Sequence, residues 1–469
     1  MPKKFISILL CVAVFLCVFS SCSSDTVKIG NLTVDVNTEN LSLIGSDATD
    51  LKKVKKLKNL KVLNISSTQI MSLKGIEELP LLEELILDGS KVTSIEEVRN
   101  LKTLKFISLS QTGVSDISPL ASGNVEKIRI MENTAISDIS VLGTLKSLKD
   151  VEIVGCTSIA DFSPIGSVVN LQRLVIRDSG LHNIDFFKNL TNLETLEIKA
   201  KAIRNAEPFS CLKNLKSFYF TGSDILSGLE QIKNLEKLET LIMPECMITD
   251  ISNLSALKNL KVIDFSLNGI ENLVPLKDLV NLEEINLASN TALKDISPLV
   301  NLKKLRVIHL EGCAVEDINV VKGLTGLREL YLNNCKIKSL EAVRGLVGLE
   351  KLLADNCEVS DISPLKNLNN LTHLQLVNNG ITDISHLSGK TKLIQLGLGS
   401  NAFKDTTVLN SMTELVNLDV SNNKNITDLH FAEKMTKLAY LNADRTSVSA
   451  HDAEHMKAHL PACTISCES

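Results

Sequence analysis

Histidines near the C-terminus have the residue types and spacing of a metal site. The string His451-Asp452-Ala453-Glu454-His455 is followed by His459, so a helix would place three imidazoles on one face. Such histidines can bind Zn²⁺, and a neighbouring glutamate can act as the base in a hydrolysis. A hydrolytic zinc also needs a further protein ligand in a dry cleft, and only Glu468 follows as an acid. We therefore expect no metal site here, but a polar capping helix that begins at Ser449 or Asp452.

The N-terminal residues place a cysteine where it could be acylated. The string MPKKFISILLCVAVFLCVFSSC has two lysines, an apolar run from Phe5 to Phe19, and small residues before Cys22. This pattern is typical of a secretory signal, and the run is shorter than the roughly 20 residues of a membrane-spanning helix. The segment at 19–22 resembles a bacterial lipobox, which implies a signal peptide over 1–21 and lipid attachment at Cys22. An ordinary cleaved signal is the alternative.

Between these ends the sequence repeats itself. The pattern L-x-x-L-x-L-x-x-[N/C]-x-[IL] recurs in eighteen copies from Leu63 to Leu441, at steps of 21 to 23 residues, and Leu41 with Leu43 forms a less regular opening strand. One such coil cannot close a core, whereas stacked coils bury each leucine against its equivalent about 5 Å away. We predict an α/β repeat solenoid of the leucine-rich-repeat type over 39–448, with a short tether or cap at 22–38 and a C-terminal cap at 449–469.

Each coil also places one polar residue at the [N/C] position, where it can satisfy backbone groups buried in the turn after the strand. We assign this structural turn ladder to Asn133, Cys156, Cys246, Asn268, Asn290, Cys313, Cys335, Cys357, Asn379, Asn401 and Asn423. The ladder cysteines should be buried and reduced, although three of them stack in consecutive coils and a strained disulfide there is the alternative. Cys463 and Cys467 stay open, because a strand would separate them by about 13 Å whereas a turn could join them.

The second half of the repeat carries the strings SDISPL at 115–120 and 360–365, KDISPL at 294–299 and TDISHL at 382–387. These strings resemble the internalin-type 22-residue repeat of bacterial surface proteins, over about residues 40 to 460. The resemblance implies a gently curved rod, roughly 85 Å long at about 4.8 Å per coil. It also implies a parallel sheet on the concave face and short 3₁₀ turns on the convex face. Receptors of particular internalins do not transfer.

Side chains between the strand leucines should face the concave side, where a partner can reach them. The candidate partner-binding residues are Tyr219, Ile242, His309, Tyr331, Leu353 and Tyr440. Tyrosine suits interfaces because it offers a large rigid surface with a polar tip. His309, Tyr331 and Leu353 occupy the same place in successive coils, so they should lie side by side about 5 Å apart. Acids at Glu284, Glu311, Glu329 and Asp355 should form a polar margin around them.

A run of six lysines at 52–61 lies close to the expected lipid anchor. It could attract anionic lipid headgroups, but its spacing favours the solvated back of an ordinary coil. The net charge of the whole chain is −5, which argues against nucleic acid as a partner.

No nucleotide-binding loop or nucleophile motif is present, so we expect no cofactor and no enzyme. The sequence predicts an exported bacterial lipoprotein, monomeric and anchored to a membrane at the cell surface or outer membrane, with the periplasmic side as an alternative. Its concave face would bind a protein ligand, with adhesion to host proteins as one form of that binding. The alternative is a structural scaffold that binds wall or membrane components of the envelope.

Overall fold

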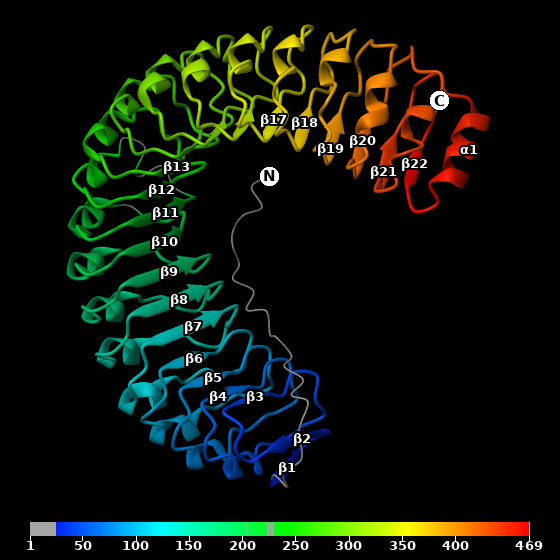
Figure 1. The fold of residues 1–469 in the computed structure, drawn as a ribbon. Helices are drawn as coiled ribbons and strands as arrows, with labels where there is room; N and C mark the ends of the chain where they lie inside the picture. The colour runs from blue at the N-terminus through cyan, green and yellow to red at the C-terminus, as the bar shows by residue number, and fades with distance from the viewer. Residues whose placement is uncertain (1–24, 204, 223–225, 227–228, 469) are drawn as a thin grey trace.

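The computed structural model describes residues 25–203, 205–222, 226 and 229–468. Within them, strands β3 to β22 pair in parallel and in chain order into one continuous sheet, which lines the inside of an arc (Figure 1). Short 3₁₀ helices lie on the outside of the arc, so every coil is one strand, one turn and one return segment. The predicted solenoid, with its concave parallel sheet and convex 3₁₀ turns, is confirmed.

The strands differ in length along the arc. Those before the middle are β1 (Thr26–Ile29), β2 (Leu32–Asp35), β3 (Asn40–Ser42), β4 (Val62–Asn64), β5 (Glu84–Ile86) and β6 (Phe106–Ser108). The five-residue strands are β7 (Lys127–Met131), β8 (Asp150–Val154), β9 (Arg173–Arg177), β10 (Thr195–Lys199) and β11 (Ser217–Thr221). Three-residue strands follow: β12 (Thr240–Ile242), β13 (Val262–Asp264), β14 (Glu284–Asn286), β15 (Val307–His309), β16 (Glu329–Tyr331), β17 (Lys351–Leu353), β18 (His373–Gln375), β19 (Gln395–Gly397), β20 (Asn417–Asp419), β21 (Tyr440–Asn442) and β22 (Thr464–Ser466).

The convex face is built from 3₁₀ helices of three or five residues. They are η1 (Val54–Lys56), η2 (Ile76–Glu78), η3 (Glu96–Asn100), η4 (Ser118–Ser122), η5 (Ser140–Thr144), η6 (Ser163–Ser167), η7 (Asp185–Asn189), η8 (Glu207–Cys211), η9 (Glu230–Ile232), η10 (Ser252–Ala256), η11 (Val274–Leu276), η12 (Ser297–Asn301), η13 (Asn319–Gly323), η14 (Glu341–Val343), η15 (Ser363–Leu365), η16 (Ser385–Leu387), η17 (Thr407–Ser411) and η18 (His430–Ala432). The lysine run at 52–61 surrounds η1 on this face, and three of its members pair with Glu78 or Glu39. That placement is the solvated back of a coil.

The D-I-S strings begin these helices. Asp361 Oδ1 accepts the backbone N–H of Ser363 at 2.8 Å, which starts η15, and Asp116 does the same for Ser118 before η4. Asparagines serve equally at other coils, as Asn272 does for Val274. A side-chain oxygen two residues ahead satisfies an N–H that the short helix leaves unpaired. The motif that suggested the resemblance is therefore a turn that repeats along the whole arc.

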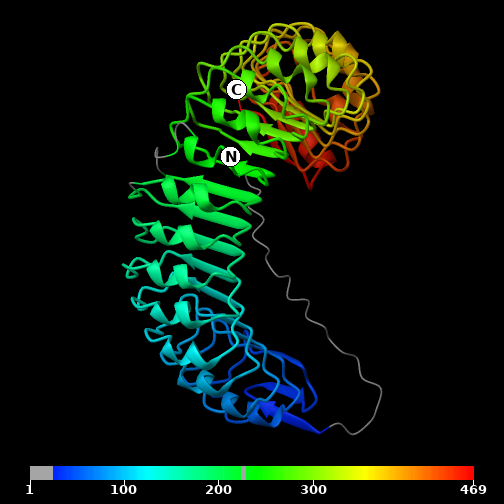
Figure 2. The same cartoon turned by 90° about the vertical axis from the view of Figure 1, so that its left-hand side faces the viewer.

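The core is a continuous column of leucine, isoleucine and valine that runs through all the coils. Around β10 and β11 larger side chains replace them, and Phe209 lies 5.2 Å from Phe218 between ring centroids. Strands stand about 4.8 Å apart, whereas a 3₁₀ helix is broader, so each coil is a wedge. These wedges add up to an arc that also twists out of its plane (Figures 1 and 2). The solenoid is curved, as the resemblance implied, but its curvature is stronger than that of a gently curved rod (Figure 1).

Both ends of the column are covered. At the N-terminus, β1 and β2 form an antiparallel hairpin that buries Val27, Ile29 and Val34. Gly30 in its turn has a φ of +58°, and an added Cβ would lie 2.7 Å from the backbone nitrogen of Ala48. At the C-terminus, helix α1 (Ala450–His459) precedes β22, which extends the sheet by a strand that the repeat pattern did not predict.

Candidate functional site

The concave surface consists of three positions in each coil: the residue before, the residue after and the third residue after the leading strand leucine. The middle position of consecutive strands runs Tyr219, Ile242, Asp264, Asn286, His309, Tyr331, Leu353 and Gln375, all in register. These side chains are half-buried by their neighbours. The register therefore sets a continuous row, as the repeat spacing predicted.

His309, Tyr331 and Leu353 lie side by side in this row, on β15, β16 and β17. The rings of His309 and Tyr331 stack with 4.0 Å between centroids and 9° between planes. Such a stack fixes both rings at a low cost in side-chain entropy and presents a rigid aromatic and apolar surface. The predicted adjacency of these three residues is confirmed, and their role in binding stays a prediction.

Two acids lie directly against the aromatic pair. The hydroxyl of Tyr331 donates to Glu329 Oε2, and Glu329 Oε1 lies 3.0 Å from Lys351 Nζ. His309 Nδ1 lies 3.1 Å from Glu311 Oε1. The other oxygen of Glu311, Oε2, is buried without a hydrogen-bond partner among the described residues. Glu311 and Glu329 are therefore part of the centre and not the polar margin that the sequence suggested.

This environment shifts the ionisation of its members. Burial, the hydrogen bond to Glu329 and nearby acids raise the pKa of Tyr331 well above its usual value. Burial and the charge of Asp419 raise the pKa of Asp355, although its carboxylate accepts the backbone N–H of Val377 at 2.7 Å. Burial and the charge of Lys351 lower the pKa of His373. Acidic charges therefore raise the pKa at Tyr331, whereas at His373 the charge of Lys351 outweighs that of Glu329.

The other candidate residues lie elsewhere on the concave face. Tyr219 and Ile242 are neighbours on β11 and β12, and Asp264 and Asn286 separate them from the row. Tyr440 is on β21, where it pairs in register with Asn417 of β20, and it is 41% exposed. The structure thus gathers three of the six candidates into one surface, places two together beyond it, and sets Tyr440 apart.

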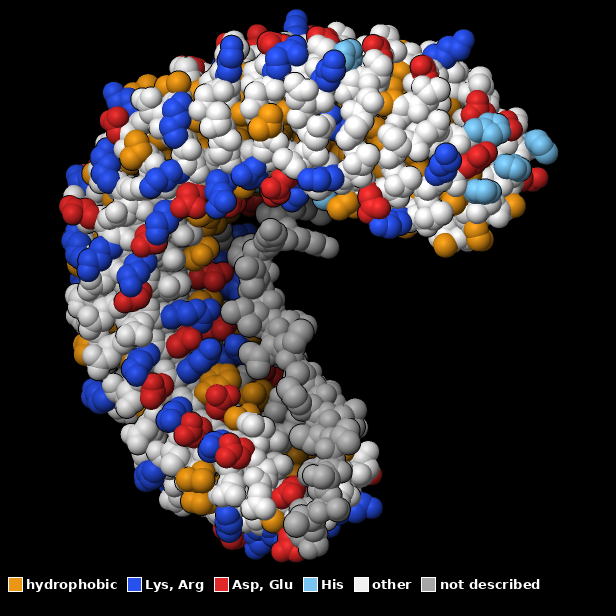
Figure 3. Space-filling model, in the orientation of Figure 1, with side chains coloured by type: hydrophobic (Ala, Val, Ile, Leu, Met, Phe, Trp, Pro, Cys, Tyr) orange, Lys and Arg blue, Asp and Glu red, His pale blue; other side chains and the backbone are white. Residues whose placement is uncertain are grey.

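A network of ion pairs covers the concave face of β7 to β10, and the sequence analysis missed it. Asp150 lies 2.8 Å from Arg173 Nη1 and 3.4 Å from Lys127 Nζ. Glu152 lies 3.4 Å from Arg129 Nε and 3.6 Å from Arg173 Nη1. Acidic and basic side chains alternate along the arc in this region (Figure 3). The signal in the sequence was acids and bases exchanged between equivalent places of consecutive repeats.

The turn ladder lies beneath the concave surface. The amide Nδ2 of Asn290 donates to Phe265 O at 2.9 Å, and its Oδ1 accepts the backbone N–H of Ile270 at 2.8 Å. Asn133, Asn268, Asn379, Asn401 and Asn423 likewise donate to carbonyls of the preceding coil. Each bond joins one coil to the last and satisfies a carbonyl that the turn would leave unpaired.

The ladder cysteines make the corresponding bond through sulfur. The thiol of Cys335 donates to Leu310 O at 3.1 Å and that of Cys313 to Leu287 O at 3.2 Å. Cys156, Cys246 and Cys357 donate to Ile130, Phe220 and Leu332 in the same way. All five are buried, and burial raises the pKa of Cys335 to about 12. Burial likewise raises the pKa of Cys156, Cys313 and Cys357, so thiolate chemistry is suppressed at these four positions.

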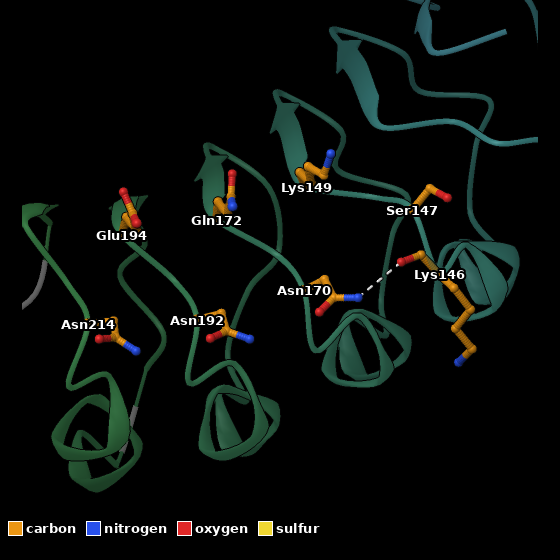
Figure 4. Close-up of a pocket in the computed structure, with 8 residues that line it drawn as sticks. All are labelled: Lys146, Ser147, Lys149, Asn170, Gln172, Asn192, Glu194 and Asn214. Carbon is orange, nitrogen blue, oxygen red and sulfur yellow. Dashed lines mark hydrogen bonds between the residues drawn. The ribbon is translucent and has the colours of Figure 1, made fainter. Parts of the chain in front are cut away.

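A second asparagine ladder runs along one flank of the arc. Asn170 Nδ2 donates to Lys146 O at 3.3 Å, and Asn192 and Asn214 repeat the bond in the next coils (Figure 4). Beside them, Lys149, Gln172 and Glu194 form a parallel row, and the two rows border a shallow polar groove. The signal was the asparagine directly before the first leucine of L-x-x-L, a place that the repeat pattern did not include.

The C-terminal histidines lie on the capping helix, as the sequence predicted. Ser449 Oγ accepts the backbone N–H of Asp452 at 3.1 Å, which begins α1. The rings of His455 and His459 lie 6.4 Å apart between centroids and are exposed. Histidine side chains gather at the C-terminal end of the arc (Figure 3). Within the described residues, no group of three or more His, Cys, Asp or Glu side chains is arranged to hold a metal ion.

Two remaining predictions concern the chain ends. Strand β22 lies between Cys463 and Cys467, and both thiols are free, so the strand alternative applies. Cys22 and the signal segment lie outside the described residues. In the part of the chain that is described, no helix combines the length and the hydropathy that crossing a bilayer requires.

Comparisons with known proteins agree with this architecture. Residues 280–323 and 325–367 match the family described as Leucine Rich repeats (2 copies). A comparison with curated proteins found no match. A solved leucine-rich-repeat protein of Leptospira interrogans is 21% identical over 92% of this chain and 96% of its own, with a TM-score of 0.53.

Two further solved structures give the range of the likeness. TLR13, in its complex with ssRNA13, is 21% identical over 83% of this chain and 64% of its own, with a TM-score of 0.54. An internalin of Listeria monocytogenes is 22% identical over 79% of this chain and 90% of its own, with a TM-score of 0.41. At such identities the likeness concerns the fold, which is that of a leucine-rich-repeat solenoid.

Proposed function

We propose that this leucine-rich-repeat solenoid is a membrane-anchored binding protein whose concave face captures a protein partner around His309, Tyr331 and Leu353. One observation carries the proposal: the stacked rings of His309 and Tyr331, in register with Leu353, form a rigid, half-buried aromatic and apolar surface on the concave face. Protein interfaces concentrate their affinity in such aromatic centres surrounded by polar groups.

The solenoid contributes rigidity to this binding. The row is supported from below by the ladder thiols of Cys313, Cys335 and Cys357, which join the same three coils. Because the surface is preformed, a partner would bind without ordering a loop, which lowers the entropic cost of association. We extend the proposal to a lipid on Cys22, which would keep the exported solenoid at a bacterial membrane and present its concave face to other proteins.

Affinity capture with variants tests the binding surface. The full chain, purified in detergent, would be used to capture proteins from its surroundings by cross-linking, with wild type compared with Tyr331→Ala and Leu353→Ala. We expect each variant to weaken capture of the same saturable partner by about 1 to 3 kcal/mol, because a hot-spot side chain is truncated. The control is Lys338→Ala, whose side chain pairs with Glu358 away from the concave row.

The outcomes separate the two classes of function. Unchanged capture by both Tyr331→Ala and Leu353→Ala would show that this row is not the binding site. Tyr219 and Ile242 would then be the next candidate binding residues. Retention of the protein only by peptidoglycan or membranes would favour the envelope scaffold. For the anchor, Cys22→Ala should abolish incorporation of a radiolabelled fatty acid and release the chain from the membrane fraction, and label retained on this variant would reject the lipid.

A further inference from the structure

The concave surface from β13 to β21 is strongly acidic. At the three concave positions of these coils, the acids are Asp264, Glu284, Glu311, Glu329, Asp355, Asp419 and Asp444. The corresponding lysines and arginines consist of Lys351 alone. We call this surface the acidic half of the concave face. Its charge is set by residues outside the core, so the fold does not require it.

The acidic half is also poorly neutralised by the chain itself. Glu329 lies 3.0 Å from Lys351 Nζ, but among the described residues the other acids of this surface have no lysine or arginine within ion-pair distance. The face of β7 to β10 shows the opposite arrangement, since Asp150, Glu152 and Glu197 each pair with arginine. The same sheet thus carries one half whose charges are satisfied internally and one half whose charges are not.

The centre of the acidic half adds a second observation. Glu311 Oε2 is buried, and within the described chain it accepts no hydrogen bond. A buried carboxylate oxygen without a donor costs free energy until a donor arrives, and a guanidinium or ammonium group is the strongest donor a protein offers. Beside it, the stacked His309 and Tyr331 and the side chain of Leu353 provide apolar contact for the methylene stem of such a residue.

We propose that the partner of this surface presents arginine or lysine side chains to it, with one cationic group seated between Glu311 and Glu329 and its stem against Tyr331 and Leu353. This inference rests on the proposed function, because it names the chemistry of the partner at the same row. A partner without positive charge would desolvate the acids of this surface, Glu311 among them, without supplying a charge to compensate them. The binding should therefore weaken as ionic strength rises.

A labelled peptide tests the chemistry without the natural partner. The probe contains arginines and leucines separated by glycines, and the comparison peptide replaces each arginine by citrulline, which has the same shape and no charge. Binding to the full chain is measured by fluorescence anisotropy at two salt concentrations. We expect the arginine peptide to bind at least about tenfold more tightly than the citrulline peptide at low salt, with a smaller ratio at high salt.

Matched variants locate the binding. Glu311→Gln combined with Glu329→Gln removes two charges from the centre, and Glu83→Gln combined with Glu239→Gln removes two charges from flank pairs with Lys105 and Lys261. We expect the first pair to weaken binding of the arginine peptide about tenfold and the second less than about twofold. Circular dichroism would verify that both variants fold.

Two results would overturn the inference. Equal weakening by both variant pairs would show attraction to net charge only, and equal or absent binding of the two peptides would show that charge does not select the ligand. The proposed function and this inference fail separately. Unchanged capture of the natural partner by Tyr331→Ala and Leu353→Ala would reject the binding row itself. Loss of capture in Tyr331→Ala, together with insensitivity to salt and to the glutamate changes, would keep the row and reject a basic partner.

Discussion

The concave faces of β7–β10 and of β13–β21 share one backbone register, but their charged side chains are arranged differently. In β7–β10, acids and bases pair across adjacent strands, as Asp150 does with Arg173 and Lys127. In β13–β21, acids surround the stacked rings of His309 and Tyr331, and among the described residues Glu329 is the one acid of this surface that lies within ion-pair distance of a lysine or arginine. Ion pairs within the chain already neutralise their charges, so a charged partner gains little by binding there. Unneutralised charge beside an apolar centre offers more binding energy to a partner of opposite charge.

The two regions also differ beneath the surface. The ladder from Cys246 to Asn423 consists only of cysteine and asparagine, each bonded to the preceding coil. In the β10 coil the ladder position is Lys201, which is exposed, and phenylalanines fill the core nearby. Coils can therefore be joined by buried hydrogen bonds below the sheet or by ion pairs and aromatic packing around it. The following variants test that division, from the largest expected effect to the smallest.

Among the variants considered, substitutions in the turn ladder of the second region should lower the free energy of unfolding the most. Cys335→Asp should lower the free energy of unfolding by about 1 to 3 kcal/mol or more, because a carboxylate would be buried facing the carbonyl of Leu310. Cys335→Asn should be tolerated, since asparagine makes the same bond at Asn379. Urea unfolding followed by circular dichroism measures both, and equal midpoints for the two variants would contradict the ladder.

One residue of the second region, Lys390, lowers the stability of the fold. Lys390 is fully buried where other coils have Leu368 or Met412, and among the described residues its Nζ donates only to Lys366 O and Asn369 Oδ1. Lys390→Leu should raise the free energy of unfolding by about 1 to 3 kcal/mol at neutral pH, because a desolvated charge is removed. The exposed Lys392→Leu is the control and should give no such gain.

The pH dependence of this gain has a definite sign. Burial lowers the pKa of Lys390 from its ordinary value of 10.5, so the folded state disfavours the charged form. Wild type is then penalised below that folded pKa and recovers stability as the pH rises through it toward 10.5. The advantage of Lys390→Leu should shrink over the same range, and thermal melts between neutral and alkaline pH would show a constant advantage if the interpretation were wrong.

The ion-pair network should matter in the first region and not in the second. Asp150→Asn removes contacts with both Arg173 and Lys127 and should lower the unfolding free energy by about 0.5 to 1 kcal/mol, less at high salt. Glu284→Gln in the acidic half removes no such pair and should leave stability unchanged or slightly raised. Equal losses in the two variants, measured at low and high salt, would erase the distinction between the regions.

Acid should act on both regions alike, through the D-I-S turns that they share. Hydrogen bonds from the backbone and side chain of Ser363 lower the pKa of Asp361 from 3.8, and those of Ser140 do the same for Asp138. Their stabilising contribution is complete above 3.8 and is lost as the pH falls through the lowered values. Asp361→Asn should keep its turn, as Asn272 does, and should reduce the acid sensitivity of melting. An unchanged pH profile would refute this role.

The repeat sequence determined the coil, its strand and the residues of the ladder, because each depends on spacing within about 22 residues. Register then followed, since a slip of one residue would expose every strand leucine. The adjacency of His309, Tyr331 and Leu353 was predictable for the same reason. Strand β22 was not, because Thr464-Ile465-Ser466 contains only one apolar residue and follows a helix.

Only the tertiary structure decided how neighbouring coils use their surface side chains. The stacking of His309 on Tyr331, the position of Glu311 and Glu329 within the centre, and the pairing of Asp150 with two bases all depend on side-chain rotamers between coils. The strength of the curvature was equally hidden, because a small rotation between coils accumulates over the whole sheet (Figure 1). Periodicity fixes which residues are equivalent, whereas contacts between coils fix what those residues do.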